Sequence, residues 1–255
     1  MIPRLVLIAA ALVIASACGN RDARAGLAAD KEFEFAAHRV RAAVPGNWSV
    51  LDQGRQKRLR NGESEIVLEN LGPADPDGVR REVERARDLW KAGQSGEAQL
   101  ALNNLHAPAE LFPTAEDNRA YQVVRARLAV YREERPFETV AADFVELLGR
   151  VSELPARTAD QLAEWGLTQL GHDQRRDVKS RRTLTVDGHD AVEIETWSRL
   201  DHTYPQRFLF VADSGDLLAL HTPREADAAS AKVFESVSDS LHFLAPGPVG
   251  SLQSN

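Results

Sequence analysis

The side chains that most often carry chemistry are few in this chain, which has one cysteine and seven histidines among its 255 residues. The single thiol, Cys18, cannot form an internal disulfide. A zinc site needs several converging ligands, but no two histidines lie three or four residues apart in one expected helix, and no HExxH pattern occurs. The sequence also has no glycine-rich phosphate loop. We therefore expect neither a metal nor a cofactor.

The strongest catalytic candidate is Asp213, which opens the triplet Asp213-Ser214-Gly215 after an apolar run. The triplet is the local signature of aspartic proteases, in which two close aspartates share one proton. This chain has one copy, so aspartic-type hydrolysis would need a dimer. The alternative is a hairpin turn in which Asp213 bonds the turn backbone and Gly215 takes a positive φ. We favour the turn, because "LLALH" follows directly as a partner strand, and we expect no enzyme.

Two basic clusters, "RQKRLR" at 55–60 and "RRDVKSRR" at 175–182, stand against a formal net charge of −7. The acidic balance argues against a nucleic-acid partner. The clusters predict a patch for anionic envelope material, such as phospholipid or lipopolysaccharide phosphates. The alternative is that they are exposed faces of edge strands, where Lys and Arg oppose aggregation. The residues of this possible patch are Arg55, Lys57, Arg58, Arg60, Arg181 and Arg182.

Residues 1–17 are expected to be a secretory signal. Arg4 supplies the positive region, Leu5–Ile14 is an unbroken apolar stretch, and the small residues at 15–17 suit a signal peptidase. The apolar stretch is too short to span a bilayer as a mature helix. These features predict export from the cytoplasm.

The stretch "ASAC", residues 15–18, resembles the lipobox of bacterial lipoproteins. In that family the cysteine becomes the first mature residue, its sulfur carries diacylglycerol, and its amino group carries an acyl chain such as palmitate. The resemblance implies lipidation of Cys18, with an ordinary signal peptide as the alternative. Such proteins tend to stay in the inner membrane when Asp follows the cysteine, so Gly19 and Asn20 imply the outer membrane, facing the periplasm. The small, polar character of the next residues predicts a lipidated tether over 18–31.

The rest of the chain divides into blocks of different periodicity. Strand-like alternation at 32–73 and 172–244 brackets a block, 74–171, whose apolar side chains recur at helical spacing. Residues 245–255 are expected to be a disordered tail. We predict an α+β fold, in which an antiparallel sheet with a C-terminal packing helix at 226–241 is interrupted by a long all-helical insertion.

Local signals mark the ends of several elements. Asp187-Gly188 and the stretch 213–216 predict tight hairpin turns. The strands on either side of the second turn are apolar on both faces, so we expect them at the centre of the sheet, with helices covering at least one side. Thr158 and Gln161 form a capping box, which predicts the start of the last helix of the insertion.

Four places in the strand blocks resemble the PsbP-like fold family. They are Val44-Pro45 with Trp48, Asp187-Gly188 with Ala191, the stretch "RFLFVADSGDLLALH", and Ser240-Leu241 with Phe243. The resemblance implies a small α+β domain of the kind found in photosynthetic extrinsic proteins and in envelope lipoproteins. The family is mostly non-enzymatic and supplies accessory or assembly factors, and its usual domain lacks the helical insertion.

Part of the insertion resembles a single tetratricopeptide helix pair. The residues that carry this resemblance are Ala86, Leu89, Gly93, Ala98, Leu102 and Leu105. Such repeats need stacked neighbours, so a plain helical hairpin is the alternative. Either arrangement suggests contact with a peptide or protein.

Three functions stay open at this point. The first is a non-catalytic, membrane-anchored envelope lipoprotein that binds a partner protein as an accessory or assembly factor. The second is a lipid- or anionic-glycan-binding module that uses the basic clusters or a cleft between sheet and insertion. The third is an aspartic-type hydrolase that uses Asp213.

Overall fold

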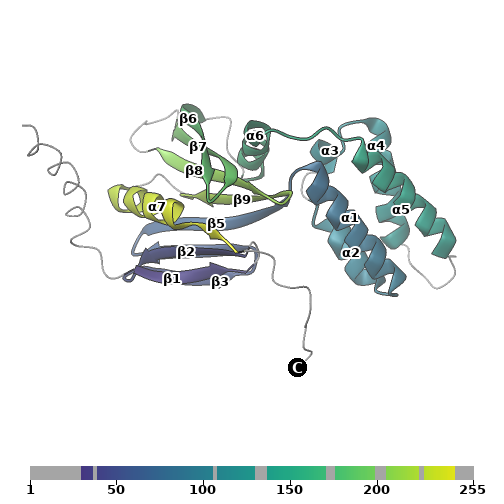
Figure 1. Cartoon of the computed structure of the whole chain (residues 1–255), viewed down its shortest axis with the longest axis horizontal. Helices are drawn as coiled ribbons and strands as arrows, with labels where there is room; N and C mark the ends of the chain where they lie inside the picture. The colour runs from purple at the N-terminus through teal and green to yellow at the C-terminus, as the bar shows by residue number, and fades with distance from the viewer. Residues whose placement is uncertain are drawn as a thin grey trace, which may run out of the picture.

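The computed structural model describes seven stretches of the chain: residues 30–36, 39–105, 108–129, 137–170, 176–198, 205–223 and 227–244. The expected signal, Cys18, nearly all of the tether and the tail lie outside the described residues. No helix within these stretches is long and apolar enough to cross a membrane. Figure 1 shows the strands gathered at one end of the molecule and most of the helices at the other.

The main sheet has seven antiparallel strands in the order β3-β4-β5-β9-β8-β7-β6. The pairing of β5 with β9 joins the strands that precede the helices to those that follow them. β8 and β9 lie at the centre of the sheet, as predicted from their apolar sequences. The strands are β3 Ser49–Gln53, β4 Gln56–Asn61, β5 Ser64–Pro73, β6 Arg176–Val186, β7 His189–Ser198, β8 Gln206–Asp213 and β9 Asp216–His221.

Two tight turns close the hairpins β6–β7 and β8–β9. Asp187 and Gly188 have φ values of 49° and 86°, and Ser214 and Gly215 have values of 50° and 89°. Positive φ at both central residues is the conformation that matches the twist of paired strands, and glycine adopts it without a steric penalty. Both predicted turns, including the positive φ of Gly215, are confirmed.

One face of the main sheet is covered by helix α7, Ala228–Ser240, and by a small second sheet. The second sheet has the order β1-β2-β10, with β1 Asp30–Phe35, β2 Val40–Pro45 and β10 His242–Phe243. Phe234 and Val237 of α7 are fully buried against β2 and the sheet. The predicted C-terminal packing helix therefore closes this core (Figure 1).

The opposite face of the sheet is covered by helix α6, Ala159–Gln169. The helix begins at the predicted capping box, in which Thr158 and Gln161 bond each other's backbone N–H groups. Trp165 packs among residues of β7, β8 and β9. α6 thus lies in the range expected for the insertion but belongs, by its packing, to the sheet.

The other helices form a bundle with a core of its own. Each long helix contacts two neighbours around a closed ring, α1-α2-α4-α5, with α5 packed back on α1. The bounds are α1 Pro76–Lys91, α2 Ser95–Asn103, the short α3 Pro108–Leu111, α4 Ala115–Ala129 and α5 Phe137–Ser152. Ala98 and Leu102 are buried in this ring, and Tyr121 donates a hydrogen bond to the carbonyl of Leu102 at 3.0 Å. α1 and α2 therefore pack as one half of a closed bundle rather than as a unit open to stacked repeats.

Candidate functional site

The bundle is fixed to the sheet by the turn between β8 and β9. The carbonyl oxygen of Gly215 accepts hydrogen bonds from the backbone N–H groups of Ala74 at 3.0 Å and Asp75 at 3.4 Å. Asp75 in turn caps α1 by accepting from the N–H of Gly78 at 2.9 Å. A Cβ atom on Gly78 would lie 2.2 Å from the carbonyl oxygen of Gly215, so only glycine allows this approach. We call this contact the joint.

Charged side chains surround the joint. Arg81 donates to a carboxylate oxygen of Asp216 at 2.8 Å and also to the carbonyl of Ser214. Burial raises the pKa of Asp216, and the nearby negative charges of Asp213 and Asp75 act in the same direction, while Arg81 opposes them. The Asp-Ser-Gly triplet therefore has a structural task at the joint. Asp213 accepts a hydrogen bond from the Ser214 hydroxyl at 2.9 Å, where the sequence predicted a bond to the turn backbone.

The basic residues of β4 are paired with carboxylates. Lys57 lies 2.7 Å from Asp52, and Glu65 accepts from Arg58 at 3.0 Å and from Arg60 at 2.7 Å. Burial alone would raise the pKa of Glu65, but the hydrogen bonds from the two guanidinium groups hold it below its ordinary value. Arg55 lies in the turn between β3 and β4.

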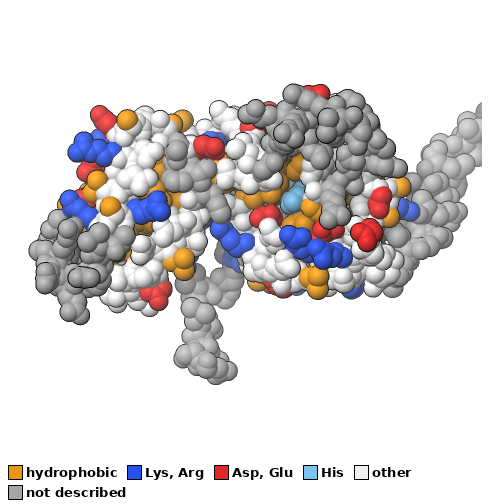
Figure 2. Space-filling view, turned by 180° about the vertical axis from the view of Figure 1, so that it is seen from behind, with side chains coloured by type: hydrophobic (Ala, Val, Ile, Leu, Met, Phe, Trp, Pro, Cys, Tyr) orange, Lys and Arg blue, Asp and Glu red, His pale blue; other side chains and the backbone are white. Residues whose placement is uncertain are grey.

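The basic residues of β6 are paired as well. Arg181 bonds Asp160 at 2.8 Å and also Glu164, both on α6, and Arg182 lies 2.5 Å from Glu193. Four strands separate β4 from β6, so the structure does not bring the two clusters together. In Figure 2, Lys and Arg side chains are interspersed with Asp and Glu on the face shown.

A buried ion network holds α7 on the sheet. Arg207, with 8% of its side chain exposed, donates to Glu193 at 2.7 Å and to Glu235 of α7 at 2.9 Å. Burial alone would raise the pKa of Glu193, yet the hydrogen bonds from Arg207 and Arg182 hold it below its ordinary value. This network stabilises the fold by joining α7 to the strands of the main sheet.

Each of the three described histidines lies beside a different carboxylate. His189 is 3.5 Å from Asp213, His242 is 2.9 Å from Asp187, and His221 is 3.7 Å from Glu69. Nothing in the described part of the chain groups three or more side chains that could hold a metal ion. His38, His106, His172 and His202 lie outside the described residues.

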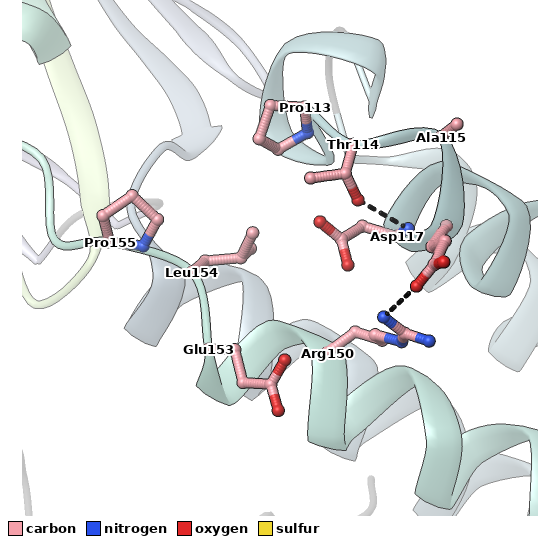
Figure 3. A pocket seen from close by; sticks show the side chains of 9 residues that line it. Pro113, Thr114, Ala115, Asp117, Arg150, Glu153, Leu154 and Pro155 are labelled. Atoms are coloured by element: carbon pink, nitrogen blue, oxygen red, sulfur yellow. Dashed lines mark hydrogen bonds and ion pairs between the residues drawn. The ribbon is translucent and has the colours of Figure 1, made fainter.

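The candidate site is a hollow of about 440 Å³ on the bundle, between the start of α4 and the segment that leaves α5. Its apolar lining consists of Pro113, Ala115, Leu154 and Pro155. Its polar lining consists of Thr114, Glu116, Asp117, Arg150 and Glu153 (Figure 3). Thr114 caps α4 by accepting from the backbone N–H of Asp117 at 3.1 Å, which sets the direction of the first helical turn.

Asp117 is the distinctive residue of this hollow. It is only 7% exposed, and within the described stretches no hydrogen bond or ion pair reaches its carboxylate. Figure 3 shows the carboxylate directed into the space between Thr114 and Leu154. The cation that lines the hollow, Arg150, is paired with Glu116 at 2.7 Å. The Glu116 hydrogen bond, with smaller effects of Asp117 and Glu153, raises the pKa of Arg150. Acidic residues outnumber basic ones three to one in the lining of the hollow.

A second hollow of about 310 Å³ continues the first toward the joint and shares Pro113, Leu154 and Pro155 with it. At its far side Arg157 donates to the carbonyl of Glu110 at 2.5 Å, and burial lowers the pKa of that guanidinium. We call the two hollows together the groove. It runs from the first turn of α4 to the first turn of α1.

The sequence predictions named none of the residues that line the groove as candidate site residues. The stretch Thr114-Ala115-Glu116-Asp117 indicates the start of a helix, because a threonine cap followed by acidic residues suits the positive end of the helix dipole. Nothing local indicates that Leu154 and Pro155 will line the same hollow as Asp117. What identifies Asp117 is a buried position without a hydrogen-bond partner, and this can be observed only in the folded chain.

Comparisons with known proteins show no family for this chain. No protein-family model matches the chain, and no curated protein matches it significantly. One similar solved structure is that of cyanobacterial PsbP (CyanoP) from Synechocystis sp. PCC 6803. It is 10% identical in sequence, with a TM-score of 0.40 over 87% of this chain and 96% of that chain. The α+β class, with antiparallel sheets, a C-terminal packing helix and a helical insertion, is confirmed by the elements themselves.

Proposed function

We propose that this protein is a non-catalytic envelope lipoprotein, anchored in a membrane through lipid on Cys18, whose helical insertion binds a partner protein. The observation that carries the proposal is the groove on the bundle, with its buried and unpartnered Asp117. Both faces of the main sheet are covered by helices, so the sheet acts as a scaffold. The joint then presents the bundle in one orientation. Such an arrangement suits an accessory or assembly factor.

Photo-crosslinking from single positions tests where a partner binds. A photoreactive residue would replace the exposed Ala115, Leu100 or Val145 on the insertion, and the exposed Leu51 of β3 would be the matched position on the sheet. We expect adducts of one defined mass from at least one insertion position in intact cells, and none from Leu51. Adducts from Leu51 alone, or from all four positions alike, would contradict binding through the insertion.

The anchor is tested separately. Cys18→Ser should move the protein from the membrane fraction to the soluble fraction, because the thioether to diacylglycerol can no longer form. Mass spectrometry of the wild-type N-terminal peptide should find an acylated Cys18. A wild-type chain with a free Cys18 thiol would refute the lipoprotein part of the proposal and leave the partner-binding part intact.

The lipid- or glycan-binding alternative draws less support. The basic residues of β4 and β6 are paired with carboxylates, and Arg55 lies near enough to Glu69 and Asp216 for its charge to favour their ionised forms. The two clusters also lie on strands separated by four others. Exposed ion pairs are weak, so anionic lipid could still displace the carboxylates. Charge reversal at Arg58, Arg60, Arg181 and Arg182, followed by sedimentation with anionic vesicles, decides the point: loss of binding would favour this alternative.

A further inference from the structure

The environment of Asp117 is unusual for a carboxylate. A buried charge is normally paired or hydrogen-bonded, because removal from water is costly. Asp117 as a residue is more than nine-tenths buried, its carboxylate faces the hollow, and no hydrogen bond or ion pair reaches that carboxylate among the described residues. Asp117 stands in the first turn of α4, a position where helices commonly carry acidic side chains. An acidic side chain without a hydrogen-bond partner that faces a hollow is a candidate for contact with a ligand.

The walls of the hollow restrict what could neutralise this charge. Apolar atoms of Pro113, Ala115 and Leu154 surround the approach, so a ligand would bury an aliphatic part before its charge reached Asp117. The hollow has three carboxylates and one guanidinium, and that guanidinium is already bonded to Glu116. An anion would be repelled. A Lys or Arg side chain has the required form, an apolar stem that ends in a positive group.

We propose that the hollow at the start of α4 binds a single basic side chain, lysine or arginine, presented by the partner protein. The proposal rests on the proposed function in one respect, namely that a protein supplies the side chain. The cationic head bonds the carboxylate of Asp117, the stem packs on Leu154 and Pro113, and Glu153 at the exposed rim attracts the head during approach. A small organic amine shares this chemistry and is a separate arm of the test.

The chain offers a close control for Asp117. Glu97 is the third residue of α2, as Asp117 is the third residue of α4, and both acids stand in the first turn of their helices. Glu97 is exposed, whereas Asp117 is buried in the hollow. A loss of helix-dipole stabilisation would affect both positions, while a loss of ligand binding would affect Asp117 alone.

The experiment is a titration followed by amide NMR of the full chain carrying Cys18→Ser, which cannot be lipidated. The probes are the Nα-acetyl methylamides of lysine, arginine and norleucine, with butylamine as the small amine. We expect saturable shifts at Ala115, Asp117 and Leu154 with lysine or arginine and none with norleucine. Asp117→Asn should weaken binding at least tenfold, and Glu97→Gln should leave it unchanged. Butylamine binding as tightly as the lysine probe would overturn the assignment to a protein side chain.

A second variant tests the same site if Asp117→Asn does not fold. Ala115→Trp fills the hollow from an exposed position at the first residue of α4 and leaves the carboxylate in place, and it should also abolish binding. Unchanged affinity in either folded variant, or an equal loss in Glu97→Gln, would overturn the proposal.

Crosslinking and probe binding can also be compared in Asp117→Asn. If probe binding is lost while crosslinks from Leu100 persist, the site for a basic side chain is supported and the partner also binds elsewhere. Probe binding without any crosslink would retain the site and refute the partner.

Discussion

At the scale of single residues, the network of Arg207 allows a test of a buried ion pair's contribution to stability. Arg207→Met would leave Glu193, 7% exposed, inside the protein without its main partner. Removal of one member of a buried ion pair costs about 3–5 kcal/mol. Urea unfolding should show that loss. Arg85→Met is the control, because Arg85 is 62% exposed and its pair with Glu82 contributes less than roughly 1 kcal/mol. Equal losses in the two variants would contradict the assignment.

The pH dependence of stability tests two carboxylates whose pKa values move in opposite directions. The pKa of Glu193 is lower in the folded state, so its contribution is fully present above roughly pH 4.3 and is lost as the pH falls through the folded value. The pKa of Asp216 is higher in the folded state, so its contribution is lost as the pH rises through the folded value. The destabilisation by Glu193→Gln should therefore shrink in acid.

Asp216→Asn should show the opposite trend, becoming more stable relative to the wild type as the pH rises above about 4. The loss of the bond from Arg81 lowers the whole curve but adds no slope in this range, because arginine stays charged. The free energy of unfolding in urea, measured between about pH 2.5 and pH 7, checks both trends. Two variants whose differences from the wild type change with pH in the same direction would show that one pKa direction is wrong.

At the scale of elements, the joint depends on two backbones that touch. Gly78→Ala would place a Cβ atom 2.2 Å from the carbonyl oxygen of Gly215, and neither backbone has a flexible end that could yield. We expect a loss of roughly 1–3 kcal/mol, typical of overpacking. Gly149→Ala on α5 is the control, because its Cβ would meet no atom within 4 Å. That variant should gain about 0.5–1 kcal/mol from helix propensity. Thermal and urea unfolding of both variants measure the difference, and a gain in Gly78→Ala would contradict the joint.

The elements also show which features a sequence can predict. The turns at Asp187-Gly188 and Ser214-Gly215, and the cap at Thr158, are local, because each depends on a few consecutive side chains bonding their own backbone. The packing of α6 is different. Its apolar face suits a sheet as well as a helix bundle, and the deciding feature is Gly166, where a Cβ would lie 2.4 Å from the ring of Phe210. That contact joins strands and helix across more than forty residues.

The candidate site is non-local for the same reason. Asp117 is an ordinary helix-start residue until the fold brings Leu154 and Pro155 to the same hollow. The basic residues of β4 and β6 form clusters in the sequence, but the strand order places the two clusters far apart in the sheet. The pairing register of β4 with β5 also brings the carboxylate of Glu65 opposite Arg60. Charge runs in a sequence therefore overestimate the charge on a surface, because antiparallel pairing places opposite charges side by side.

At the scale of the whole molecule, the structure has three apolar cores. One lies between the main sheet and α7, one between the main sheet and α6, and one inside the bundle. The first two share strands β8 and β9, whereas the bundle meets them through the joint and the first turn of α1. Each core holds one buried tryptophan: Trp48, Trp165 and Trp90 respectively. The fluorescence of these side chains can therefore follow each core separately.

Three variants, each retaining one of these tryptophans with the others and Trp197 replaced by Phe, would report the cores in urea. Trp48 and Trp165 should unfold in one coincident transition, because strands that form both cores cannot be removed from one alone. In the Gly78→Ala background the Trp90 transition should separate from the other two, since the weakened joint uncouples two units that each have their own core. Separation of Trp48 from Trp165 would mean that the shared strands do not couple the two cores. Gly78→Ala could instead lower the midpoints of all three tryptophans while the Trp90 transition still coincides with those of Trp48 and Trp165. That result would mean that contacts other than the joint also hold the bundle to the sheet.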